Sequence, residues 1–250
     1  PIVAGQTTNY FKQAVTISEL ETSNWGIFHE IGHNMQMNST WSFNNNVEVT
    51  CNLFSLKKAS IYNYTPGTLV TGWEGKGSNN NENPGAADFL KLDTSVKDWT
   101  NVTQLGKFSP RLIFYQQVFE KYGFGFMTYL ATEARNARFT AIDDQSKVDF
   151  YYERLSEYTK TDMYRFMREW GLNVSQTSRK AIAAKGFKKL KANVWAYNPA
   201  TNTGGNDSII SEHPRTDWLL TLPSAHTSYP GTNLLDNNPA TFWNGNYKGT

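Results

Sequence analysis

Apolar positions between residues 24 and 62 recur every three to four residues, which is the spacing of helices with a buried face. The pattern predicts a largely buried helix from Asn24 to roughly Asn38, with Ser23 or Asn24 as its N-terminal cap. A second helix is predicted from near Asn46 toward Tyr62. Because the connection is short, we expect the second helix to run back antiparallel to the first.

The rest of the chain alternates between turn-forming and helical segments. Residues 72–85 are rich in Gly, Asn and Pro, and we predict a surface loop there. A few strands are expected from residues 10–17 or 187–195. Helical periodicity returns in four later segments, with Gly171 as the stop signal of the last: 110–122, 125–135, 144–158 and 161–170.

A change of pattern after Tyr197 predicts a domain boundary. The segment NPATNTGGNDS has the composition of a linker or turn cluster, and the segments beyond it look like short strands. We therefore divide the chain into a helical domain at 1–197, a linker at 198–215 and the beginning of a β module at 216–250. The chain opens at Pro1 and closes within a patterned segment, so we expect it to be part of a longer protein that supplies more of the first domain.

Charge and cysteine content narrow the classes of partner and site. The chain has 24 Lys and Arg against 22 Asp and Glu, a net charge of +2, which argues against nucleic acid as the main partner. It contains no run of about eighteen apolar residues, so no membrane span is predicted. Cys51 is its single cysteine, which excludes an internal disulfide framework and a Cys-rich metal site.

Residues 28–33, FHEIGH, contain the pattern His-Glu-x-x-His. Helix positions i and i+4 lie one above the other, so His29 and His33 can direct their imidazoles at one zinc ion. Glu30 lies beside them, where it can take a proton from a water at the metal and return it to a departing amine. The alternative is a buried helix whose histidines only hydrogen-bond their neighbours. Trp25 flanks the motif and is expected to pack the helix, with stacking on sugar rings as its alternative role.

A catalytic zinc needs a third protein ligand and an open position for water. Glu48 is the best candidate, because it lies fifteen positions after His33, on the helix expected to cross the metal. Asn52, one turn beyond Glu48, can orient a ligand histidine through a hydrogen bond. A plain surface carboxylate is the alternative for Glu48, and Glu21, upstream of the pair, is a less suitable ligand. We expect Cys51 to be a small buried residue turned about 100° from Asn52.

The stretches WGIFHEIGHNMQ and VEVTCNLFSL resemble the signature of family M60, the enhancin-like, mucin-active zinc peptidases, whose pattern is His-Glu-x-Gly-His followed by a downstream Glu. The resemblance extends through RLIFYQQVFEKYGFGFMTYL and MYRFMREWGLNVS, and covers roughly residues 1–183. It implies that His29, His33 and Glu48 bind zinc and that Glu30 is the catalytic base. It also implies glycoprotein substrates, notably O-glycosylated mucins, and a secreted or cell-surface location in bacteria of mucosal surfaces.

The tail at 233–243, NLLDNNPATFW, resembles the opening of a discoidin-type domain, similar to factor 5/8 C-terminal modules and family 32 carbohydrate-binding modules. Only the first third or so of such a module is present. The resemblance implies that the intact protein joins a peptidase to a module that binds host glycans. Such a module raises the effective concentration of the enzyme at a glycosylated surface.

We therefore predict an α+β fold, with a mainly α-helical gluzincin-like catalytic domain followed by the start of a β-sandwich. The predicted function is that of an extracellular zinc endopeptidase acting on glycoproteins. Two alternatives stay open: a glycan-binding surface adhesin with an inactive peptidase-like domain, and a zinc peptidase of another lineage that acts on unglycosylated peptides. The intact His29, Glu30, His33 and Glu48 favour the enzyme, because a scaffold has no need of a water-activating carboxylate.

Overall fold

The computed structural model describes residues 15–21, 24–44, 46–76 and 82–207. The chain divides into two units, Pro1–Ser208 and Ile209–Thr250, and every described residue belongs to the first. The residues predicted to begin a β-sandwich, 216–250, lie outside the described part of the chain.

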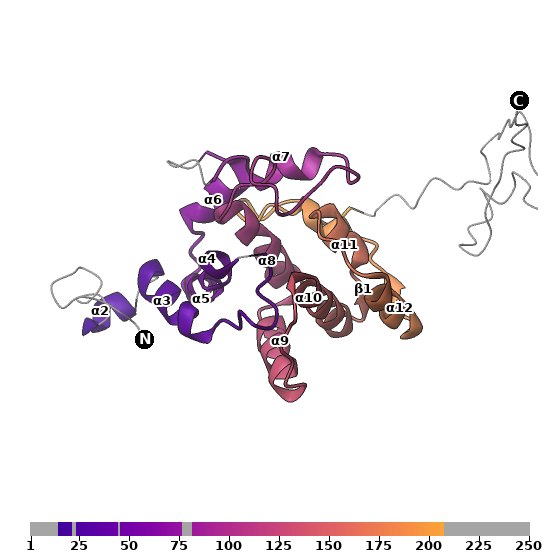
Figure 1. Cartoon of the computed structure of the whole chain (residues 1–250). Helices are drawn as coiled ribbons and strands as arrows, with labels where there is room; N and C mark the ends of the chain where they lie inside the picture. Colours follow the sequence, from indigo (N-terminus) through magenta and orange to yellow (C-terminus); the bar gives the residue numbers. More distant parts are fainter. Residues whose placement is uncertain (1–14, 22–23, 45, 77–81, 208–250) are drawn as a thin grey trace, which may run out of the picture. The chain divides into compact units, whose positions relative to one another are not determined.

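Helices dominate the described residues (Figure 1). Two strands, β1 (Thr161–Asp162) and β2 (Lys188–Lys189), pair in parallel, and η1 (Val194–Ala196) is a short 3-10 helix. The prediction of a mainly helical α+β domain is confirmed. The α-helices are α2 (Ile17–Leu20), α3 (Trp25–Met35), α4 (Val47–Thr50), α5 (Asn52–Ile61), α6 (Gly67–Glu74), α7 (Ala86–Lys91), α8 (Ser109–Tyr122), α9 (Gly125–Asn136), α10 (Asp144–Thr159), α11 (Tyr164–Glu169) and α12 (Gln176–Ala184).

A helix that crosses a membrane must be both long and apolar. None of those in the described residues is both long enough and apolar enough to cross a membrane.

Helix α8 forms the core of this unit and packs against α4, α5, α6, α7 and α9 (Figure 1). Every residue from Ser109 to Phe119 is buried, which is typical of a helix enclosed on all sides. Pro110 suits its first turn, where the missing N–H would have no helical partner. The Phe114 ring contacts its neighbour Tyr115 and lies at the centre of an aromatic cluster. The other members come from distant segments: Phe43, Trp99, Tyr151, Phe166 and Trp170.

Helix α3 carries the His-Glu-x-x-His segment and packs against α5. Asn24 caps it, because the Asn24 side chain accepts a hydrogen bond from the backbone N–H of Ile27 at 3.4 Å. Gly32 lies where α3 meets the backbone between α4 and α5, and a Cβ at this position would overlap the Cys51 carbonyl group. Cys51 keeps helical backbone angles (φ −61°, ψ −34°), so α4 and α5 form an almost continuous second helix, as predicted.

Some boundaries differ from the prediction. Gly72, expected at the start of a loop, lies inside α6, where the absence of a side chain lets the helix approach the backbone of Ser109. The helix predicted from residue 161 begins at Tyr164, because Thr161–Asp162 pairs with the strand at Lys188–Lys189. Ile17, expected in a strand, belongs to α2, whereas residues 10–14 of that prediction lie outside the described part of the chain.

The contact at Gly32 predicts the effect of adding a methyl group there. We expect Gly32→Ala to lower the free energy of unfolding by about 1–3 kcal/mol, the usual cost of overpacking, because the new Cβ meets backbone that cannot move aside. Gly67→Ala is the matched control, since a Cβ at Gly67 meets no atom within 4 Å. Urea unfolding of both variants and the parent measures the difference, and equal midpoints for Gly32→Ala and the parent would contradict the close contact.

Candidate metal centre

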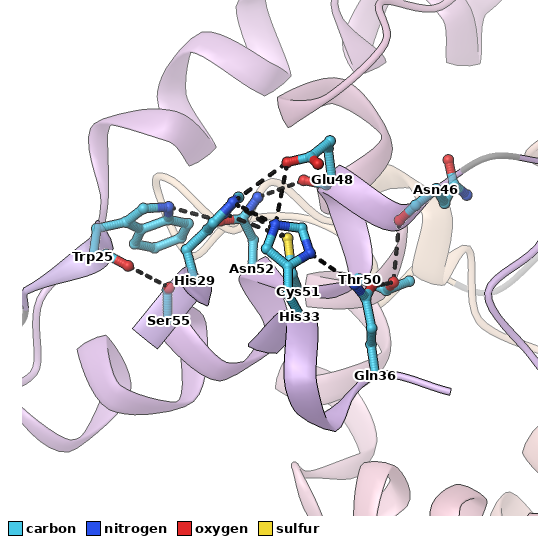
Figure 2. A network of polar contacts seen from close by, with 10 residues as sticks. All are labelled: Trp25, His29, His33, Gln36, Asn46, Glu48, Thr50, Cys51, Asn52 and Ser55. Carbon is cyan, nitrogen blue, oxygen red and sulfur yellow. Dashed lines mark hydrogen bonds and ion pairs between the residues drawn. The ribbon is translucent and has the colours of Figure 1, made fainter. Parts of the chain in front are cut away.

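Two helices bring three candidate ligand atoms together. His29 and His33 lie one turn apart on α3, and Glu48 faces them from α4 (Figure 2). The two Nε2 atoms are 3.0 Å apart, and Oε2 of Glu48 lies 3.3 Å from Nε2 of His29 and 3.6 Å from Nε2 of His33. The histidine side chains are 22% and 26% exposed and that of Glu48 is 51% exposed, so the site opens to solvent beside the carboxylate.

These separations fit a single zinc ion. Ligands at about 2.0–2.1 Å in a tetrahedral shell are roughly 3.3 Å from one another. The three separations in the structure, from 3.0 to 3.6 Å, lie around that value. Two imidazoles and one glutamate also form a ligand set found in hydrolytic zinc sites, and they leave a fourth position for water.

A hydrogen bond between the two histidines accounts for fewer of these three separations than a single zinc ion does. Nδ1 of His29 lies 2.8 Å from Oδ1 of Asn52, which only accepts, so the His29 proton lies on Nδ1 and its Nε2 is bare. A bare nitrogen and a carboxylate oxygen 3.3 Å apart repel unless a cation lies between them. One proton on His33 can bond to only one of these two atoms at a time, whereas a metal ion binds all three.

Asn52 holds His29 from the second helix of the pair. Its Oδ1 accepts hydrogen bonds from Nδ1 of His29 and from the indole Nε1 of Trp25, both at 2.8 Å. Its Nδ2 donates to the backbone carbonyl of Glu48 at 2.7 Å. Asn52 therefore links the ring of one candidate ligand to the backbone of another. Trp25 was expected only to pack or to stack on sugars, and its position four residues before His29 is the signal for this additional contact.

Gln36 holds His33 at the end of α3. Nε2 of Gln36 lies 2.8 Å from Nδ1 of His33, and Oε1 of Gln36 accepts a hydrogen bond from the Thr50 hydroxyl at 2.7 Å (Figure 2). Sequence reasoning missed both residues. Gln36 lies three residues after His33, a helical spacing that could have identified it, whereas the sequence has no comparable signal for Thr50.

Cys51 lies against His29, which the sequence did not predict. Its side chain is buried as expected, but Sγ is 3.4 Å from Nδ1 and 3.8 Å from Nε2 of His29. Burial, and then the charge of Glu48, raise the pKa of the thiol to about 12. Without a metal ion, burial therefore favours the protonated thiol. Cys51 belongs to the same cluster of potential metal-binding side chains as His29, His33 and Glu48.

Glu30 follows His29 on α3 and is partly exposed. Its backbone carbonyl accepts a hydrogen bond from Nδ2 of Asn34 at 3.0 Å. Its carboxylate is close enough to the cluster to make a small contribution to the raised pKa of Cys51, after burial and Glu48. Glu21, the other acid considered, is exposed beyond the end of α2 and is not among the clustered residues.

Several solved structures share this fold at low sequence identity. A functionally unknown conserved protein from Bacillus anthracis matches with a TM-score of 0.59 at 19% identity, over 81% of this chain and 39% of that one. The ZmpB metallopeptidase from Clostridium perfringens matches at 0.53 and 21%, over 80% and 37%. The ZmpB M60 catalytic domain, solved with its CBM51-1 and CBM51-2 domains, matches at 0.55 and 20%, over 77% and 19%. The chain thus spans less than half the length of each of these structures. No protein with a curated description matches it significantly.

A family comparison agrees with the fold. The family described as peptidase M60, enhancin and enhancin-like, matches residues 3–171, which is more than half of the chain and includes α3, α4 and α5. All the side chains of the candidate metal centre lie within the matched region. The chain therefore belongs to the peptidase M60 family of enhancin and enhancin-like proteins.

Proposed function

We propose that the chain carries the catalytic domain of a zinc-dependent endopeptidase, with His29, His33 and Glu48 as zinc ligands and Glu30 as general base. The strongest support is that Nε2 of His29, Nε2 of His33 and a carboxylate oxygen of Glu48 lie 3.0–3.6 Å from one another. Helix α3, which carries both histidines, also carries Glu30. Membership of the M60 peptidase family supports the same class of reaction.

The protein residues divide the work of hydrolysis between metal binding and proton transfer. When bound, zinc supplies a Lewis acid that lowers the pKa of water and polarises a substrate carbonyl. Glu30 takes a proton from the attacking water and delivers it to the departing amine nitrogen. It lies about 100° around the helix from His29, so its carboxylate borders the site without joining the ligand set. Asn52 keeps the His29 ring turned so that Nε2 faces the site.

The proposed substrates are glycoproteins, in particular O-glycosylated mucins, and the proposed location is secreted or at the cell surface. The resemblance of residues 25–56 to mucin-active enzymes and of residues 233–243 to a glycan-binding module supports both. Residues 1–197 then form the catalytic domain and 198–215 a linker. Residues 216–250 begin a discoidin-like module that binds host glycans.

Replacing the general base tests the proton-transfer role. Glu30→Gln keeps the shape of the side chain but removes the proton acceptor, so cleavage of an O-glycosylated mucin is expected to fall by about 100-fold or more. Zinc content, measured by elemental analysis of the same preparations, is expected to stay at one ion per chain.

Glu21→Gln is the matched control, because it neutralises an exposed acid outside the cluster and is expected to leave cleavage unchanged. Cleavage by Glu30→Gln at the parent rate would rule out Glu30 as the base. If the parent holds no zinc and cuts nothing, the adhesin alternative becomes the better one.

Replacing Glu48 and Cys51 separately tests the ligand set. Glu48→Ala removes a ligand, so zinc affinity is expected to fall by more than the roughly 10–100-fold lost with an outer hydrogen-bond partner. Cys51→Ala removes a thiol that lies on the Nδ1 side of His29, and we expect zinc affinity within a few-fold of the parent. Competition with a chelator measures both, and a larger loss for Cys51→Ala than for Glu48→Ala would contradict the assignment.

The glycoprotein proposal predicts a substrate preference. A mucin carrying its O-glycans is expected to be cleaved faster than the same mucin after enzymatic deglycosylation, because the proposed substrates are O-glycosylated proteins. Equal rates, or faster cleavage of the deglycosylated form, would favour the peptidase that acts on unglycosylated peptides.

A further inference from the structure

A chain of hydrogen bonds leads from His33 into the interior. Nδ1 of His33 contacts Nε2 of Gln36 at 2.8 Å, and Oε1 of Gln36 accepts from the Thr50 hydroxyl at 2.7 Å. The Thr50 oxygen also lies 2.9 Å from Oγ of Ser42 and 3.1 Å from the backbone carbonyl of Asn46. Thr50 and Ser42 are buried and Gln36 is partly buried, so the inner end of this chain is shielded from water.

Each histidine contacts a different side-chain amide, His29 through the amide oxygen and His33 through the amide nitrogen. Asn52 presents its oxygen to His29, which places the proton on Nδ1 and leaves Nε2 bare for a metal. Gln36 has its amide nitrogen beside Nδ1 of His33 at 2.8 Å, and in this orientation Nδ1 is the acceptor and the ring proton belongs on Nε2. Nε2 of His33 is 3.6 Å from Oε2 of Glu48, so this proton lies where a metal ion would bind.

Metal binding requires the other tautomer of His33. Its Nε2 must be bare, so its proton must lie on Nδ1, and Nδ1–H needs an acceptor. A half-turn of the Gln36 amide exchanges Nε2 and Oε1 and supplies that acceptor. The amide nitrogen then faces Thr50, whose oxygen can accept because its own proton can turn toward the Asn46 carbonyl. Every polar group of the chain therefore has a partner in both orientations.

We propose that Gln36 is a positioning residue for metal binding, which stabilises His33 with its oxygen when zinc is bound and with its nitrogen when the site is free, while the Thr50 hydroxyl completes both arrangements. This inference rests on the proposed zinc site. Gln36 lies just beyond α3 with extended backbone angles (φ −66°, ψ 147°), so its side chain reaches both the helix that carries His33 and the helix that carries Thr50.

Variants of Gln36 on the 250-residue chain test the inference by zinc affinity, measured by competition with a chelator. Gln36→Met keeps the length of the side chain but offers only a weakly accepting thioether in place of the amide oxygen, so zinc is expected to bind about 10–100-fold more weakly. Gln36→Glu offers only acceptors, favours Nδ1–H without a turn of the side chain, and is expected to bind zinc at least as tightly as the parent. Thr50→Val removes the hydroxyl and is expected to weaken zinc binding less than Gln36→Met does.

Asn34→Ala is the matched control, because it removes an exposed amide next to His33 that bonds to the Glu30 carbonyl and, among the described residues, to none of the site's side chains. It is expected to bind zinc as the parent does. Cobalt(II) absorption of the same proteins adds a second readout. The parent and Gln36→Glu are expected to share one spectrum, and Gln36→Met is expected to differ because the His33 ring is no longer fixed.

Opposite effects of Met and Glu at position 36 distinguish positioning of the ring from a merely structural role, which both changes would disturb alike. Parent-like zinc affinity in Gln36→Met overturns the inference and leaves the zinc site intact. If Gln36→Met does not fold, weaker zinc binding by Gln36→Glu than by the parent overturns it instead. Absence of zinc binding in the parent overturns the proposed function and this inference together, and the parent measurement alone identifies that case.

Discussion

The backbone contact between α3 and the junction of α4 with α5 is the constraint on which the candidate site depends. Gly32 lets the two segments approach until no side chain fits between them at that point. His29 and His33 then face Glu48 across a distance that one metal ion can bridge. The buried helix α8 packs against both α4 and α5, so the side of the site that carries Glu48 rests on the aromatic core rather than on a loop.

Hydrogen bonds across this helix pair fix the orientation of the rings. Asn52, on α5, bonds to the ring of His29, and Gln36, at the end of α3, bonds to both His33 and Thr50. Each histidine is therefore tied to the opposite helix, directly or through one amide. Rings that are already oriented lose less freedom when a ligand binds, which favours metal affinity. The Glu48 side chain, which is half exposed, forms the side of the site that faces solvent.

The helices and the candidate ligands could be predicted from sequence because each depends on local spacing. His29 and His33 are four residues apart on a helix with a recognisable cap, and Glu48 follows on a second helix with its own apolar pattern. The structure brings these residues together with Asn52 as expected, although their roles remain predictions. The contacts that could not be predicted join residues far apart in the chain, as between Thr50 and Gln36 or between Cys51 and His29. They depend on how closely two helices approach, and the pattern of apolar residues does not encode that distance.

The central claim is that one zinc ion is bound by two imidazoles and one carboxylate, with no sulfur. X-ray absorption at the zinc edge, on the 250-residue chain loaded with one equivalent of zinc, tests it most directly. Nitrogen and oxygen ligands at about 2.0–2.1 Å, with the outer-shell scattering of two imidazole rings, are the expected result. A sulfur ligand at about 2.3 Å, or zinc without imidazole scattering, would contradict it.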